Sequence, residues 1–394
     1  MSEGAEAAGP SRATILLMAV ACGLTVANLY YAQPLIGLIG PELGLHGGPA
    51  TLAVTLTQIG YGLGLVLVVP LGDLFESRRL ICHSLRLAAV AVLAAGLAPN
   101  AAVFLVAAFG IGLLAVAAQI LIPLAAGMTP PQHRGRVVGE VMTGLLGGVL
   151  LARPAASLMA YGLGWRSIFF VSAALLLVLS FVLARTLPQS QPAGRMKYGE
   201  LVGSLWPLLR DTPVLQRRAA YQFGLFGAFS AFWTCAPLQL ASPAFGYSQR
   251  EIALFGLAGA TGALVAPIAG RLADAGYSRP VSLAAFLLSI LGFVASLPGK
   301  TGSLIAMLAA ALLIDGATQL SQITGQRAIY TLAPEVRSRL NGLFIGIFFL
   351  GGACGSAGAG FAYAHGGWPW AAAVGCAFSV APLLIFLTEP RRRA

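Results

Sequence analysis

One run of the sequence places an acid and three amides on a single helical face. Asp315, Gln319, Gln322 and Gln326 are spaced four, three and four residues apart, so a helix stacks their side chains in one stripe. The run continues an apolar segment, where an acid near mid-bilayer costs about 2.5–3.5 kcal/mol and normally faces a partner or a wet cavity. We therefore expect this helix to line a substrate path. The competing interpretation is a satisfied contact between two helices.

The composition is that of a multi-pass membrane protein. The chain has 394 residues, of which 58% are hydrophobic and 9% charged, and apolar stretches of about 20 residues recur between short polar turns. The first stretch, 13–40, is too long for the core of a signal peptide and follows an acidic leader. The five cysteines sit singly in apolar segments without metal-ligand spacing, so we expect no disulfide, no metal and no cofactor.

Twelve membrane helices are predicted, six on each side of one long polar break. The break, 187–216, contains prolines, glutamines and basic residues and is expected to be a cytoplasmic linker between two domains, 1–186 and 217–394. The predicted fold is an all-α integral membrane protein built from two pseudo-symmetric six-helix bundles. The predicted helices are 13–40, 51–71, 79–97, 101–127, 137–161, 165–186, 217–241, 250–271, 280–297, 302–332, 340–363 and 368–388.

The basic residues lie mainly on one side of these helices. If both termini are cytoplasmic, the inner turns, the tails and the linker hold 18 of the 24 Lys and Arg residues, whereas the outer turns hold Arg166, Arg250 and Lys300. This asymmetry follows the positive-inside rule, so it explains the net charge of +11 without a nucleic-acid partner. The inner residues are Arg12, Arg78, Arg79, Arg134, Arg136, Arg185, Arg195, Lys197, Arg210, Arg217, Arg218, Arg271, Arg279, Arg337, Arg339, Arg391, Arg392 and Arg393.

The two halves repeat each other, and each half varies in threes. Residues of the same type recur at a shift of about half the chain length, which indicates duplication. The first helix of each three carries polar and aromatic residues, the second closely spaced glycines, and the third mostly apolar residues. We expect the first kind to surround a central cavity, the second to form the seam between halves and the third to face lipid. Matching pairs are Pro34 and Pro237, Gln119 and Gln322, Arg134 and Arg337, Trp165 and Trp368, Asp73 and Asp274, and Arg78 and Arg279.

Across essentially its whole length the chain resembles the major facilitator superfamily. The signature loop of that family after its second helix has the form G-x-L-x-D-R-x-G-R-R. The run 70–79 retains Asp73 and the late arginines of this pattern, and a second copy retains Asp274 and Arg279. The runs 28–35, 144–154 and 334–342 resemble a bacterial branch of drug, sugar and nucleoside exporters.

The resemblance implies two parallel halves around a midplane site and transport by alternating access. Most members of the branch exchange their substrate for protons. The resemblance also implies a multi-pass protein of the bacterial inner membrane, and we expect a monomer whose partners are a small-molecule substrate, protons and the lipid bilayer. Such antiporters usually carry an arginine in helix 4, whereas helix 4 here has none and Gln119 is its main polar residue, so the direction of transport and the coupling ion are inferred from the branch.

The predicted binding site combines amides, aromatic rings and few charges, which suits neutral or weakly charged amphipathic molecules. Arg153 either pairs with Asp315 or contacts an anionic part of the substrate. The aromatic residues either form a binding wall or pack ordinarily. The substrate-binding candidates are Asn28, Tyr31, Gln33, Gln119, Arg153, Gln222, Phe226, Trp233, Gln319 and Gln322.

Two further sets of charged residues are candidates for coupling and gating. Asp315 and Glu140 are the candidate proton-carrying acids, although Glu140 also stands four residues from Arg136 and is suited to a local ion pair. Asp73 and Asp274 are candidate latches that cap a helix of the opposite half at the cytoplasmic side, and the alternative is a solvated turn charge. Arg78 and Arg279 are expected to hold these acids in place.

The pattern as a whole favours proton-coupled efflux of small amphipathic molecules by a secondary transporter. The alternatives are an importer or facilitator of a polar metabolite, or a receptor that does not transport. No catalytic motif is present, and Gly299-Lys300-Thr301 lacks the leading glycine of a phosphate loop because Val occupies position 294, so an enzyme is not expected.

The charge asymmetry predicts that both termini and the linker are cytoplasmic. A membrane-impermeant thiol reagent applied to intact cells should label a cysteine placed at Gly47 and should not label one placed at Gln191. The opposite labelling pattern would overturn the predicted topology.

Overall fold

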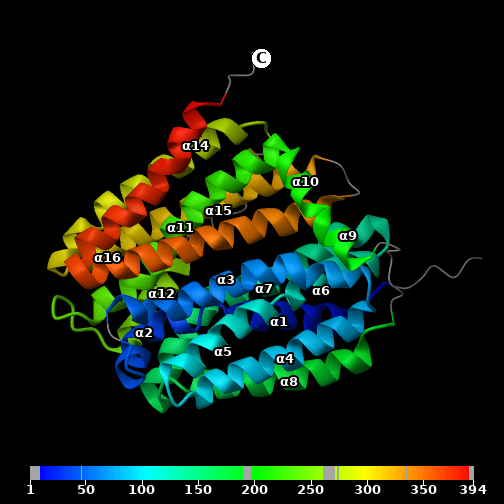
Figure 1. The fold of residues 1–394 in the computed structure, drawn as a ribbon, viewed down its shortest axis with the longest axis horizontal. Helices are drawn as coiled ribbons and strands as arrows, with labels where there is room; N and C mark the ends of the chain where they lie inside the picture. The colour runs from blue at the N-terminus through cyan, green and yellow to red at the C-terminus, as the bar shows by residue number, and fades with distance from the viewer. Residues whose placement is uncertain are drawn as a thin grey trace, which may run out of the picture.

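The computed structural model describes residues 9–45, 47–189, 197–260, 271–272, 275–332 and 336–389. Within these residues every regular element is a helix, and the helices form two bundles that lie side by side (Figure 1). In the described part of the chain, ten helical segments are long and apolar enough to cross a membrane. This confirms the predicted all-α membrane fold.

The helices of the first bundle follow the predicted ranges closely. Two predicted helices are each divided by a short turn, at residues 28–31 and 115–116. The elements are α1 (Arg12–Ala27), α2 (Ala32–Glu42), η1 (Gly48–Thr51), α3 (Leu52–Leu67), η2 (Val69–Asp73), α4 (Ser77–Leu97), α5 (Ala101–Leu114), α6 (Ala117–Gly127), η3 (Pro131–His133), α7 (Arg134–Leu163) and α8 (Ser167–Thr186).

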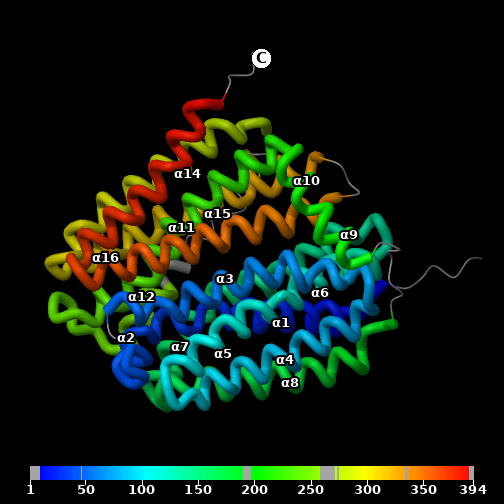
Figure 2. The backbone as a smooth tube through the Cα atoms, in the orientation of Figure 1, coloured from blue at the N-terminus to red at the C-terminus, as the bar shows by residue number. Residues whose placement is uncertain are grey.

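The second bundle contains long helices, of which α16 is two membrane segments joined at a corner. Gly367 has φ of 64° and ψ of −155°, a conformation open to glycine, and there the backbone doubles back (Figure 2). The structure therefore divides α16 into 337–366 and 368–387, as predicted. The elements are α11 (Pro213–Ala241), α12 (Gln249–Ala260), α14 (Ser278–Ala295), η5 (Leu297–Thr301), α15 (Leu304–Tyr330) and α16 (Arg337–Leu387).

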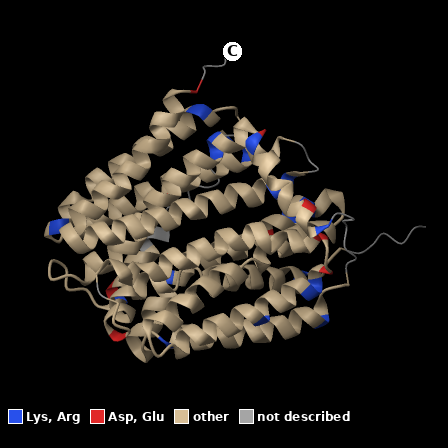
Figure 3. Ribbon diagram, viewed as in Figure 1, with Lys and Arg blue, Asp and Glu red and all other residues tan. Residues whose placement is uncertain are grey.

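Charged residues gather mainly near the ends of the helices, and most of each helix between its ends is uncharged (Figure 3). We call the end that carries Arg12, Arg134 and Arg337 the basic end, and the end that carries Glu42 and Lys300 the opposite end. Large apolar side chains on α8 and α14 are exposed, including Val178 at 58% and Leu291 at 53%. The helices predicted to be mostly apolar therefore lie on the outside of the bundles, where lipid would contact them.

The linker region contains two short helices that the sequence analysis did not predict. These are α9 (Tyr198–Gly203) and α10 (Leu205–Arg210). The hydroxyl of Tyr198 donates to the Leu67 carbonyl at the end of α3, at 2.8 Å. Arg339, in the first turn of α16, donates to the Ser204 hydroxyl at 2.9 Å. The linker is thereby held against both bundles at the basic end.

The glycines on α7 and α16 that closely approach other residues do so mostly within one bundle rather than between the bundles. A Cβ at Gly148 would lie 2.1 Å from the Gly23 carbonyl oxygen of α1. In the second bundle, a Cβ at Gly355 would lie 2.0 Å from the Gly227 carbonyl oxygen of α11. Between bundles, a Cβ at Gly62 of α3 would lie 3.2 Å from the Gly346 carbonyl oxygen. The expectation of a glycine seam is thus correct for few of these positions, because small residues also tighten helix contacts inside each half.

One arginine in each bundle joins the ends of two helices, and the two arginines do so in equivalent ways. Arg78, at the start of α4, donates to the carbonyls of Ala184 and Leu187 at the end of α8, each at 3.4 Å. Arg279, at the start of α14, donates to the Glu389 carbonyl just after α16, at 3.3 Å. Cations at helix C-termini complement the helix dipole. The pairs Arg78 with Leu187 and Arg279 with Glu389 therefore occupy matching places in the two halves.

We expect Gly148→Ala to destabilise the protein and Gly147→Ala to leave it unchanged or slightly stabilised. The added methyl group at 148 overlaps the α1 backbone, whereas nothing lies within 4 Å of a Cβ at 147. Both substitutions gain the same helix propensity, so their difference isolates the clash, which we expect to cost about 1–3 kcal/mol. Thermal unfolding in detergent measures it, and equal melting temperatures would contradict this packing.

Candidate functional site

A cavity of about 610 Å³ lies between the two bundles. Its deep end contains Arg153 and Asp315, which are 6% and 8% exposed. At the basic end it reaches Arg337 and Ser338, whose exposed side chains show that the cavity opens to solvent there. The wall comes from α1, α3, α6, α7, α11, α15 and the first segment of α16. The stripe predicted on α15 therefore does line a cavity.

The opposite end of the bundles is closed by contacts that cross between them. Gln58 of α3 donates to the Ser230 hydroxyl of α11 at 2.9 Å. Nearer the end, a Cβ at Gly360 would overlap Thr51, and one at Gly48 would lie 3.3 Å from the Phe361 backbone. The molecule is thus open at the basic end and sealed at the other.

Arg153 is held by rings and one amide. Its Nε donates to the Gln33 Oε1 at 2.8 Å. The guanidinium carbon lies 4.4 Å from the Trp233 ring centre, 5.0 Å from that of Tyr30 and 5.1 Å from that of Phe229. Aromatic faces attract such a cation, more so when it is withdrawn from water. The Arg153 Nη2 and the Gln33 Nε2 are buried and have no hydrogen-bond partner. Of the two residues only Arg153 lines the cavity, so its Nη2 is the donor that remains for a ligand.

Asp315 is bound by the same tryptophan that stacks on Arg153. The indole Nε1 of Trp233 donates to the Asp315 Oδ1 at 2.7 Å. No ion pair within 4.0 Å joins the described side chains of Arg153 and Asp315. Of the two alternatives for Arg153, a direct pair is therefore absent in this state, and Trp233 connects the two charged groups.

The predicted amides are distributed along the cavity. Gln319, Gln322 and also Gln326 line it, and Gln119 lines the facing wall, where its Nε2 donates to the Tyr61 hydroxyl at 3.2 Å. Gln222 is buried behind the wall and donates to the Thr318 carbonyl at 3.4 Å.

The aromatic wall is larger than the sequence analysis predicted. Phe226 lines the cavity and stacks on Phe229, with ring centres 5.3 Å apart. Phe348 and Phe349 of α16 each lie 4.8 Å from Phe226, and Tyr61 lies 4.5 Å from Phe349. The available signal was the adjacent pair Phe348 and Phe349, in a helix whose glycines led the sequence analysis to expect only a seam.

Six of the predicted binding and proton-coupling residues do not line the cavity. Gln33, Gln222 and Trp233 are buried behind its wall, and Asn28, Tyr31 and Glu140 make contacts elsewhere. Asn28 donates to the Leu24 carbonyl and accepts from the Ser172 hydroxyl of α8, so it occupies a contact inside the first bundle. Tyr31 is buried beside it, outside the cavity wall. Glu140 is exposed and pairs with Arg136 at 2.8 Å, the local interaction that its spacing indicated.

The predicted gate residues divide into two groups. Asp73 shares a small crevice with Arg339 and Ser338 in the first turn of α16, close enough to Arg339 for electrostatic attraction. Arg78 instead pairs with Glu76 at 3.3 Å and binds the end of α8, as described above. Arg279 likewise binds the end of α16, and Asp274 lies outside the described residues.

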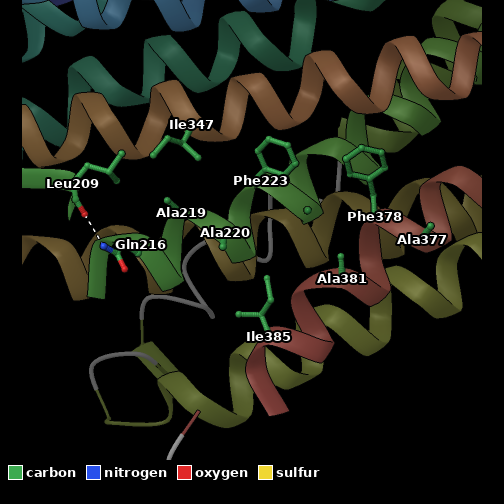
Figure 4. A pocket seen from close by; sticks show the side chains of 11 residues that line it. Leu209, Gln216, Ala219, Ala220, Phe223, Ile347, Ala377, Phe378, Ala381 and Ile385 are labelled. Carbon is green, nitrogen blue, oxygen red and sulfur yellow. Dashed lines mark hydrogen bonds between the residues drawn. The ribbon is translucent and has the colours of Figure 1, made fainter. Parts of the chain in front are cut away.

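A second hollow, of about 680 Å³, lies outside the central cavity (Figure 4). It runs between α11 and both segments of α16, and Figure 4 shows Phe223, Ile347 and Phe378 around it. Gln216, its polar residue, donates to backbone carbonyls of α10. Because this groove contains no ionisable lining residue, the central cavity is the better candidate for substrate and ion binding.

The chain is similar to known membrane transporters along nearly all of its length. A profile of the Major Facilitator Superfamily matches residues 15–275 and, in a second match, residues 219–394. The uncharacterized transporter YgaY of Escherichia coli O157:H7 is 40% identical over 376 residues, which cover 95% of each chain. The multidrug resistance protein MdtG of Citrobacter koseri is 26% identical and covers 81% of this chain and 80% of its own.

A solved structure supports the same fold. The crystal structure of a mutant of the nucleoside transporter NupG matches with a TM-score of 0.74 at 14% identity, covering 95% of this chain and 98% of that chain. The profile match, the relative at 40% identity and the shared helical architecture agree with the resemblance seen in the sequence. The chain belongs to the major facilitator superfamily, a family of membrane transporters and not of enzymes.

Proposed function

We propose that this transporter exports small amphipathic organic molecules across the bacterial inner membrane in exchange for protons. The observation that carries the proposal is the deep end of the cavity, where one acid and one arginine meet an aromatic wall. An exchanger needs a group that gains and loses a proton and a surface that binds the cargo. Asp315 supplies the first, and the rings around Arg153 supply the second.

The direction of access follows from the charges and the opening. With the basic end in the cytoplasm, as the positive-inside rule requires, the open cavity faces the cytoplasm. Alternating access then consists of separating the contacts between Gln58 and Ser230 and around Gly360 while the basic end closes. The exposed mouth at Arg337 admits cargo from the inner side.

The wall chemistry selects the cargo class. Phe226, Phe229, Phe348 and Phe349 offer ring faces, and α7 adds a row of apolar residues to the wall. Gln119 and Gln319 add neutral hydrogen-bonding groups. Apolar pockets with a few fixed polar groups bind amphipathic molecules. The distant relative MdtG, described as a multidrug resistance protein, supports this class, and NupG, described as a nucleoside transporter, marks the alternative of a polar metabolite.

The proton role is assigned to Asp315 and not to Glu140. Asp315 lies at the end of the water-accessible cavity, so its carboxyl can exchange protons with solvent in this state and face the other side after closure. Glu140 is exposed beside Arg136 on the outside of the cavity wall. An acid that does not change sides cannot couple a gradient to the cycle.

We expect Asp315→Asn to abolish uphill transport while leaving binding and substrate exchange measurable. The amide keeps the shape and still accepts from Trp233, but it cannot carry a proton. A thermal-shift screen across antibiotics, nucleosides and sugars supplies the cargo, and inside-out vesicles with an imposed pH gradient measure its accumulation. Glu140→Gln is the matched control and should transport normally. Full gradient-driven accumulation by Asp315→Asn would reject the assigned role, and transport by the wild type without any gradient dependence would favour a facilitator.

We also propose that Asp73 latches the basic end by attraction to the first turn of α16. Asp73→Asn should reduce gradient-driven transport about fivefold or more, since an allosteric coupling of this kind is worth roughly 1–3 kcal/mol, without lowering the melting temperature. Cross-linking between the ends of α3 and α16 should show wider separation. Asp211→Asn, at the exposed end of α10, is the control. Unchanged separation in Asp73→Asn would remove the latch.

A further inference from the structure

Trp233 contacts both charged groups of the cavity at once, through two different parts of its ring system. The indole N–H binds the Asp315 carboxyl at 2.7 Å, and the face of the ring lies 4.4 Å from the guanidinium carbon of Arg153. Trp233 is 2% exposed and is packed against Phe232 and Phe255, with ring centres 5.5 and 5.7 Å away. Trp233 therefore connects the two charged groups by direct contact, in addition to their electrostatic attraction.

The contact between Arg153 and Trp233 also crosses between the bundles. Arg153 belongs to α7 in the first bundle, whereas Trp233 and Phe229 belong to α11 in the second. On its own side, Arg153 is anchored by Gln33 and by the Tyr30 ring. The guanidinium thus joins the two halves just below the sealed end. We call the set Gln33, Arg153, Trp233 and Asp315 the clasp.

The strength of the clasp depends on the charge of Asp315. A hydrogen bond from an N–H group to an ionised carboxylate is about twice as strong as a neutral one, so the charged acid fixes the indole. A proton on the carboxyl weakens that bond and removes the negative charge that helps to hold Arg153 nearby. A substrate acceptor group that binds the free Arg153 Nη2 would compete for the same guanidinium from the other side.

We propose that Trp233 locks the empty transporter, and that either a proton on Asp315 or a substrate group on Arg153 releases the lock. This inference rests on the proposed proton role of Asp315 and adds the mechanism of coupling. If the empty transporter interconverts freely between its two open states, protons cross the membrane without export of substrate and the gradient is dissipated. A clasp that is closed when both sites are empty, and weakened when either is loaded, prevents that loss.

Few other charged groups act on Asp315. Arg153 on α7 and Tyr30, between α1 and α2, are the charged and titratable groups that face it in the described residues. On α15 itself, Arg327 lies about three turns nearer the basic end. The described acids and bases of α12, α14 and α16 lie near the ends of their membrane segments. A pH response of the clasp is therefore assigned to Asp315.

The test is Trp233→Phe, which keeps an aromatic face for Arg153 but removes the N–H donor. In proteoliposomes containing a pH-sensitive dye and no substrate, the wild type should show little proton leak under a pH gradient. The variant should leak at least about fivefold faster, the size expected for losing a coupling of roughly 1 kcal/mol or more. Trp368→Phe is the matched control, because its indole N–H is also buried and bonded, at 2.9 Å to the Ser296 carbonyl, away from the cavity.

A distance measurement supplies a second readout that a merely structural role would not move. Spin labels at Leu163 and Ile305, both exposed at the opposite end and in different bundles, report opening there. In a cysteine-free background, the wild type should hold one short distance at pH 8 and gain a longer one at pH 5.5. Trp233→Phe should show the same mixture at both pH values, and Trp368→Phe should follow the wild type.

The outcomes separate the lock from the proton role. If Trp233→Phe shows no increase in proton leak and the distance responds to pH as in the wild type, the proposed lock is wrong. This conclusion does not depend on the role of Asp315. A leak that persists in the double variant Trp233→Phe with Asp315→Asn keeps the lock but assigns the proton to another group, which contradicts the proposed function. A leak that disappears in the double variant supports both. If Trp233→Phe folds poorly, Gln33→Leu, which frees the Arg153 Nε, should leak in the same way.

Discussion

The pair of opposite charges buried between the bundles is the constraint on which the rest of the site depends. A cation and an anion withdrawn from water must each find compensation, and a single direct pair would lock them together permanently. Arg153 is compensated by three ring faces and one amide, and Asp315 by one indole N–H and the wet cavity. Because each charged group has partners of its own, one of them can gain or lose its charge while the other keeps stabilising contacts.

Two of the membrane helices around the cavity are interrupted near its deep part, whereas the outer helices are continuous. The turns at residues 28–31 and 115–116 interrupt the first and fourth membrane helices, and Tyr30 lies in the first of these turns. Interrupted backbone is tolerated at membrane depth where it is buried in protein or lines a cavity. The outer helices α8 and α14 carry no such interruptions and present apolar surface.

The architecture was largely predictable from the sequence, whereas the contacts of the site were only partly so. Length of apolar runs, the basic bias and the repeat determine helix number and order, because a bilayer permits few alternatives. The stripe on α15 was recognisable because its period is that of a helix. Trp233 binding both charges, Phe348 and Phe349 entering the wall, and Asn28 turning toward α8 depend on helix rotation, and rotation is set by packing that no single sequence displays.

The packing of the glycines illustrates the same limit. Spacing alone indicated close backbone approach, and approach does occur at Gly148 and Gly355, but the partner helix lies in the same bundle. A small residue specifies that a neighbour comes near without specifying which neighbour. Gly62 opposite Gly346, like Gly48 beside Phe361, is a position where the backbones of the two bundles approach each other.

The arginines that close each bundle have a consequence for how duplicated halves drift apart. Arg78 and Arg279 bind carbonyl oxygens at equivalent positions, Leu187 in one half and Glu389 in the other. Every residue type offers the same carbonyl, so replacing the acceptor's side chain leaves the bond intact. The two copies could therefore exchange a leucine for a glutamate at this place and still keep their common geometry. To keep this contact in both halves, only the arginine has to be retained, and the residue that supplies the carbonyl is free to change.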